Sequence, residues 1–85
     1  MNGTMNPVEL DVPGLVKLIR KQLALSQEAL ARQLGISFVT LHRWEKGHSK
    51  PSPLGRAQLS IFCDGKVASG QLRLEDPKWR PGSQG

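Results

Sequence analysis

The stretch Ser37–Lys46 gathers side chains that could contact the edges of nucleic-acid bases. On a helix turning about 100° per residue, Leu41 and Trp44 fall on one side. The opposite side combines an apolar contact, potential hydrogen-bond donors and cations: Val39, His42, Arg43 and Lys46. A guanidinium can bond both major-groove acceptors of a guanine, which is worth ~1–3 kcal/mol of discrimination. Because a solvated helix more often carries Glu, Lys and Gln, we interpret this face as a binding surface.

Phe38 and Thr40 flank this outward face. Phe38 and Val39 are poor hydrogen-bonding partners, but they suit the methyl group of thymine. An exposed Phe38 could instead anchor a protein partner. His42 and His48 lack the Cys, His and Asp neighbours of a metal site, so we expect no metal ligand among them.

Four helical patterns would hold this surface in place. In "PGLVKLIRKQL" the apolar residues recur at helical spacing, with Pro13 in the first turn. Ser26 can cap a second helix that ends at Gly35, and Ser37 can cap the third, which ends near Gly47.

Ser52 and Pro53 open a fourth helix, in which Leu54, Ala57 and Ile61 are predicted to face inward.

The two ends differ from this middle. Residues 1–11 are predicted to be a flexible arm and residues 12–63 the folded domain. Residues 64–85 are rich in Gly, Pro and Ser, which predicts a mostly disordered tail. A short hairpin using Val67 with Leu72 and Leu74 is conceivable at its start. Trp79, within "PKWRP", is either a tail residue or a docking motif.

The positive charge lies on the part predicted to fold. The chain of 85 residues has 12 Lys and Arg against 7 Asp and Glu, a net charge of +5. Between Val12 and Cys63 eight basic residues stand against two Glu, a balance of +6. Such a domain suits a polyanionic partner, nucleic acid or an anionic membrane surface.

Other classes of function find little support. There is no nucleophile with a base and an orienting group, no phosphate-cradling glycine loop and no pair of inward carboxylates, so we expect neither an enzyme nor a cofactor. Cys63 is alone, and the first twelve residues lack the apolar core of a signal peptide. No stretch has transmembrane length, so we expect no membrane association and a cytoplasmic, nucleoid-associated protein.

The run "LSQEALARQLGISFVTLHRWEKGHSKPSP" resembles the lambda-repressor/Cro-like helix-turn-helix family, often called Xre-type. The resemblance covers residues 15–59 and includes Ser-Gln, Leu-Ala, Leu-Gly-hydrophobic-Ser and Trp-Glu-x-Gly in order. It implies an all-α, compact domain of four, possibly five, helices. It also implies a sequence-specific double-stranded DNA-binding protein, a small repressor-like regulator that inserts helix 37–46 into the major groove.

Roles carry over from the resemblance by position. Phe38, Val39 and Arg43 match residues that read bases, and His42 joins them on the same face. Arg20 and Glu45 match an ion pair between the first and third helices. The predicted phosphate contacts are Gln27, Thr40, Lys46, His48 and Lys50.

The sequence departs from the family where a fifth helix usually closes the core and often builds the dimer. A core of about fifty residues is marginal alone, so we expect a homodimer, at least on DNA, through Leu59 and Phe62. With Phe38 and Leu59 outward, the chain is alternatively a DNA-tethering or antitoxin-like partner module of a restriction–modification, methyltransferase or toxin–antitoxin system. A third interpretation is a protein-interaction domain without DNA binding, which the balance of +6 disfavours.

Overall fold

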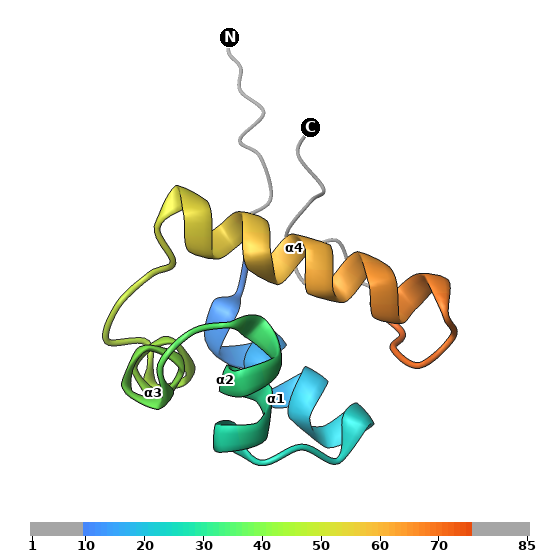
Figure 1. The fold of residues 1–85 in the computed structure, drawn as a ribbon, viewed down its shortest axis with the longest axis horizontal. Coiled ribbons are helices and arrows are strands. Elements are labelled where there is room, and N and C mark those ends of the chain that lie inside the picture. Colours follow the sequence, from blue (N-terminus) through green and yellow to red (C-terminus); the bar gives the residue numbers. More distant parts are fainter. Residues whose placement is uncertain (1–9, 76–85) are drawn as a thin grey trace, which may run out of the picture.

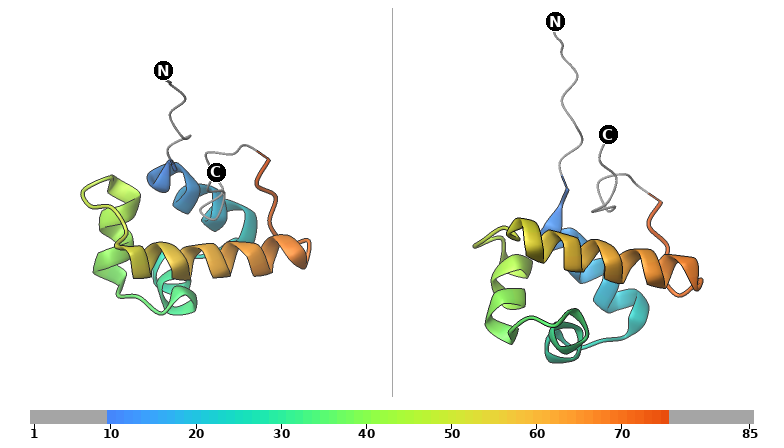
Figure 2. Two further views of the ribbon diagram at one scale, coloured as in Figure 1. Left: turned by 90° about the horizontal axis from the view of Figure 1, so that it is seen from above. Right: turned by 45° about the horizontal axis from the view of Figure 1, so that its top comes forward.

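The computed structural model describes residues 10–75, which form four α-helices and no strand. The helices are α1 (Val12–Leu23), α2 (Gln27–Leu34), α3 (Phe38–Lys46) and α4 (Pro53–Ala68). The long α4 lies across the other three, and α3 lies at one edge of the molecule in each view (Figure 1, Figure 2). The predicted all-α class with four helices is confirmed.

A capping side chain opens every helix. The hydroxyl oxygens of Ser26, Ser37 and Ser52 each accept a hydrogen bond from one backbone N–H, that of the third residue of α2, α3 and α4 respectively. Asp11, which the sequence assigned to a flexible arm, instead caps α1 by accepting from the Gly14 N–H at 3.0 Å. Each bond satisfies one of the orphan donors of a helix start.

Glycines end the two short helices. Gly35 and Gly47 have φ of +74° and +77°, a left-handed conformation that costs a residue with a Cβ more than it costs glycine. Because α2 ends so sharply, only three residues separate it from α3, which begins directly after its predicted cap, Ser37.

The core lies between α4 and the layer of α1, α2 and α3. Its fully buried side chains come from each helix and include Leu15, Ile19, Leu30, Leu41 and Leu59. At the α3–α4 contact, a Cβ on Gly55 would lie 3.0 Å from Cζ2 of Trp44. A side chain at this position would force the indole ring or α4 to shift by a few tenths of an ångström, so glycine suits this close approach.

The predicted inward face of α4 is wrong. Leu54 and Ile61 are 72% and 73% exposed, whereas Gly55, Leu59 and Cys63 are buried. Two stripes at helical spacing run along this helix, and periodicity alone does not choose between them. With no exposed surface, Leu59 also cannot form the predicted dimer contact.

The C-terminal boundary also differs from the prediction. α4 continues past Cys63 to Ala68, so Val67 is helical and residues 64–75 form no hairpin. Leu72 and Leu74 follow in a segment without regular secondary structure and are buried in the core. The Gln22 side chain fixes this segment by bonding both the N–H and the carbonyl oxygen of Arg73, at 2.8 and 3.0 Å.

Residues 76–85, with Trp79 and the rest of the predicted tail, lie outside the described residues, as do residues 1–9 of the predicted arm.

Cys63 is a core residue. Burial, together with the negative charge of Asp64, raises the pKa of its thiol from 9.0 to about 12. The side chain therefore stays a neutral thiol at physiological pH and packs as a small apolar group.

Candidate nucleic-acid interface

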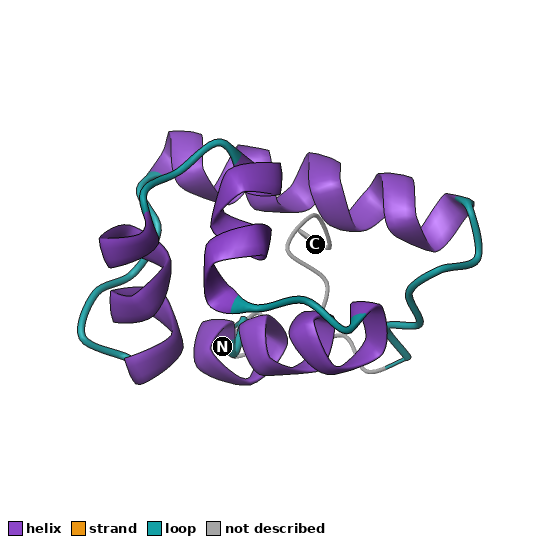
Figure 3. Cartoon of the chain, turned by 60° about the horizontal axis from the view of Figure 1, so that its bottom comes forward, coloured by secondary structure: helices purple, strands orange, loops and turns teal. Residues whose placement is uncertain are grey.

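The candidate interface is built from α2 and α3, which a three-residue loop joins (Figure 3). The loop is held by the Ile36 N–H, which donates to the Ala31 carbonyl oxygen at 3.0 Å. Leu41 and Trp44 bury the inner side of α3 in the core, as the wheel predicted. Its other side is therefore left at the surface.

The four predicted base-contacting residues occupy this surface. Phe38 is 46% exposed and Val39 62% exposed, Arg43 is exposed and His42 is half-buried. The rings of Phe38 and His42 stack with their centroids 5.9 Å apart. Aromatic rings, an aliphatic side chain and a guanidinium group thus lie along the first two turns of one helix.

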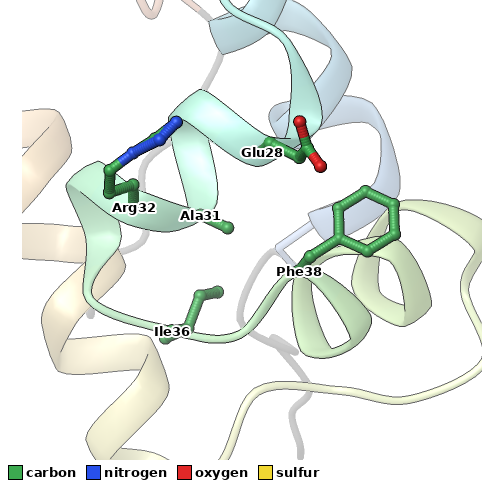
Figure 4. A pocket seen from close by; sticks show the side chains of 5 residues that line it. All are labelled: Glu28, Ala31, Arg32, Ile36 and Phe38. Atoms are coloured by element: carbon green, nitrogen blue, oxygen red, sulfur yellow. The ribbon is translucent and has the colours of Figure 1, made fainter.

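A shallow hollow lies beside α3, between this helix and α2 (Figure 4). Ala31, Ile36 and Phe38 give it an apolar lining, and Glu28 and Arg32 add one charge of each sign. The hollow is open to solvent and continues the apolar part of the α3 surface.

Arg20 and Glu45 meet between α1 and α3, as the resemblance implied. Arg20 Nη1 lies 3.0 and 2.9 Å from the two carboxylate oxygens of Glu45, and Arg20 Nε donates to the Leu25 carbonyl oxygen at 3.1 Å. Glu45 is only 8% exposed. The pair therefore joins α3 to α1 and to the loop before α2.

Gln27, predicted to contact phosphate, takes part in a network that the sequence did not reveal. Its Nε2 donates to Glu45 Oε1 at 2.8 Å, and its Oε1 lies 3.3 Å from His42 Nδ1. These partners are 18 and 15 residues away on another helix. Such a contact follows from how α2 packs on α3, which no local pattern encodes.

The other predicted phosphate contacts surround α3. Thr40, half-buried, accepts from the Ser37 hydroxyl at 2.8 Å. Lys46 is exposed at the end of α3, and His48 and Lys50 are exposed in the loop that follows. Lys46, His48 and Lys50 thus lie together at and just beyond the C-terminal end of α3.

Within residues 10–75, no three His, Cys, Asp or Glu side chains cluster in a way that could hold a metal ion. Over the same residues, no helix combines the length and apolar character needed to cross a bilayer.

Comparison with known proteins gives a consistent result. A helix-turn-helix family model matches residues 16–54. The chain is 38% identical over 45 residues to uncharacterized HTH-type transcriptional regulators of Sinorhizobium medicae and Rhizobium meliloti. The aligned part is 53% of this chain and 32% of each relative, so the chain matches about a third of their length. No solved structure matches it significantly.

Proposed function

We propose that the chain is a member of the Cro/C1-type helix-turn-helix family and a sequence-specific double-stranded DNA-binding protein, a small repressor-like regulator of transcription; the match of a helix-turn-helix family model over residues 16–54 supports this. The observation that carries this proposal is the outward face of α3. It presents Phe38, Val39 and Arg43 together on a helix at the edge of the molecule. An α-helix fits the major groove, where base pairs can be told apart.

In this proposal α3 enters the major groove. Arg43 donates to guanine O6 and N7, while Phe38 and Val39 contact thymine methyl groups. The hollow beside Phe38 gives an adjoining methyl group an apolar place to lie. In this proposal, apolar contacts thus supply part of the recognition of the base sequence.

The phosphate contacts hold α3 in register. Lys46, His48 and Lys50 extend beyond the C-terminal end of α3, and Thr40 lies on its flank. Because the Gln27 side chain bonds Glu45 and His42, we propose that Gln27 meets phosphate through its backbone N–H, at the positive end of the α2 dipole.

The test is a selection from random duplex DNA at near-physiological salt, with the Arg43→Ala and Lys50→Ala proteins alongside. We expect an enriched site that Arg43→Ala blurs at one base pair in each half-site, with a loss of ~1–3 kcal/mol there. Lys50→Ala should weaken binding to all sequences evenly and reduce the salt dependence. An Arg43→Ala protein with unchanged preference would show that α3 does not read bases.

We further propose that the protein binds DNA as a homodimer, because a small domain recognises one short half-site and a second copy doubles the contacts. The proposal includes no enzymatic activity and no cofactor.

The exposed Phe38 favours a second candidate function, a DNA-tethering or antitoxin-like module that holds a protein partner such as a toxin or methyltransferase. If this second candidate is correct, the same selection should enrich no sequence, and the protein should bind DNA only weakly and in a salt-sensitive way.

A further inference from the structure

An apolar stripe runs along the outward side of α4, opposite its buried face. Its members share exposure and lack of charge: Leu54, Ala57, Ile61, Gly65 and Ala68. Leu54 and Ile61 are the most exposed large apolar side chains of the described residues. Exposed apolar groups aligned on one helix face mark a contact surface.

The order of these residues is symmetric. Leu54 and Ala68 lie equally far along the chain from Ile61, and so do Ala57 and Gly65. When two such helices run antiparallel about a two-fold axis at Ile61, Leu54 lies level with Ala68 of the second copy and Ala57 with its Gly65. A large side chain is thus level with a small one, and helices with small residues at their contact can approach closely.

We propose that this stripe is the surface through which a second copy of the chain docks, with the two α4 helices antiparallel. The assignment rests on the dimer part of the proposed function. A two-fold contact must be self-complementary, and the symmetric order meets that condition. The five residues of the stripe carry no charge.

The size of the contact sets its strength. α4 has 16 residues and is about 24 Å long, so one helix pair covers well below the ~800 Å² per partner of a stable interface. The dimer is therefore weak in free solution. On DNA, two chains at neighbouring half-sites have a high effective concentration, and the same contact then suffices.

Disulfide trapping tests the surface and its direction without requiring DNA. Under mild oxidation, Ile61→Cys should cross-link to itself, whereas Leu54→Cys alone should not, because its two sulfurs would be about 20 Å apart. An equimolar mixture of Leu54→Cys and Ala68→Cys should cross-link. The unmodified chain is the control, since its Cys63 is buried.

Cross-linking of Leu54→Cys to itself as fast as Ile61→Cys, or none by any variant with or without duplex DNA, would overturn the assignment. Ile61→Glu should abolish association while leaving unfolding unchanged, because Ile61 is 73% exposed in the single chain. Trapping that succeeds while the DNA selection fails would leave the dimer intact and refute only DNA reading.

A separate observation concerns His42. A chain of hydrogen bonds runs from Arg20 through Glu45 and Gln27 to His42. Only one assignment of donors and acceptors is consistent along it. A carboxylate only accepts, so Glu45 receives N–H groups from Arg20 and from Gln27 Nε2. The Gln27 amide is thereby oriented with Oε1 toward His42 Nδ1. An amide oxygen also only accepts, so Nδ1 must carry a proton.

We infer that the neutral His42 ring is held as the Nδ1–H tautomer, which makes Nε2 a hydrogen-bond acceptor at the DNA-facing surface. The stacking of Phe38 on the ring restrains it further. In the major groove, only adenine N6 and cytosine N4 offer donors to such an acceptor. If the proposed DNA binding holds, His42 selects a base with an exocyclic amino group.

The tautomer is measurable in the free protein by the ¹⁵N chemical shifts of the imidazole nitrogens at mildly alkaline pH. We expect a protonated Nδ1 and a bare Nε2 in His42. His48 is the internal control, because it is exposed and free imidazoles favour the Nε2–H form. Gln27→Ala should return His42 to the pattern of His48. A protonated Nε2 in the unmodified protein would overturn the inference.

The base preference is tested on the selected site by replacing each adenine in turn with purine, which lacks the amino group, and each cytosine with 2-pyrimidinone. One replacement should weaken the unmodified protein about tenfold and leave His42→Ala unaffected. Equal losses for both proteins at every position would overturn the base assignment even if the tautomer is correct.

Discussion

Replacing Leu72 with Ala is expected to lower the free energy of unfolding by ~2–5 kcal/mol, the usual cost of removing a buried Leu side chain. Leu72 is 1% exposed and lies in the core cluster, although it follows the last helix in a segment without regular structure. Small domains are stable by only ~5–15 kcal/mol, so this loss removes a large share of the total. Urea unfolding followed by circular dichroism measures it.

The matched control is Arg73→Ala, in the same segment. The Arg73 side chain is 79% exposed, and its backbone, not its side chain, bonds Gln22. This variant should unfold within ~0.5 kcal/mol of the unmodified chain. Leu72→Ala and Arg73→Ala proteins of equal stability would mean that the segment does not close the core.

Replacing Glu45 with Ala is expected to cost ~2–3 kcal/mol of stability. The change leaves the Arg20 guanidinium and the Gln27 Nε2 without their acceptor. Removing one partner of a fully buried ion pair costs ~3–5 kcal/mol, and the 30% exposure of the Arg20 side chain reduces this figure. The loss should be measured by thermal and urea unfolding.

Two further variants distinguish the loss of the Glu45 charge from the loss of its side-chain volume. Glu45→Gln keeps an acceptor for Arg20 and should lose less than Glu45→Ala. Replacing both partners, as Arg20→Met with Glu45→Leu, should recover stability because no charge then stays buried alone. If Glu45→Ala unfolded like the unmodified chain, the pair would not join α1 to α3 energetically.

Sequence reasoning succeeded where structure depends on neighbours in the chain. The starts of α2 and α3 follow from Ser26 and Ser37, and their ends from Gly35 and Gly47, because caps and left-handed stops act within a few residues. The outward face of α3 could also be predicted from the sequence. On a helical wheel, placing Leu41 and Trp44 inward determines which residues lie on the opposite side.

It failed where the outcome depends on distant contacts. α4 has two stripes of helical spacing, and the fit of Gly55 against Trp44 selects the one that faces inward. Leu72 and Leu74 looked like tail residues because their burial depends on α1, about fifty positions earlier. The hydrogen bonds of Gln27 to Glu45 and His42 could not be predicted for the same reason. Because they occupy the Gln27 side chain, we now expect Gln27 to contact phosphate through its backbone N–H.

The fit of Gly55 against Trp44 has a consequence for signal transmission. One edge of this indole abuts α4, while the residue itself belongs to α3. With no side chain on Gly55 between them, the rigid indole ring of Trp44 couples the position of α3 to that of α4, which bears the proposed dimer surface. If α3 binds an operator and α4 binds a second copy, as proposed, this contact joins the two sites, and thermodynamic reciprocity then requires that DNA binding and self-association affect each other equally.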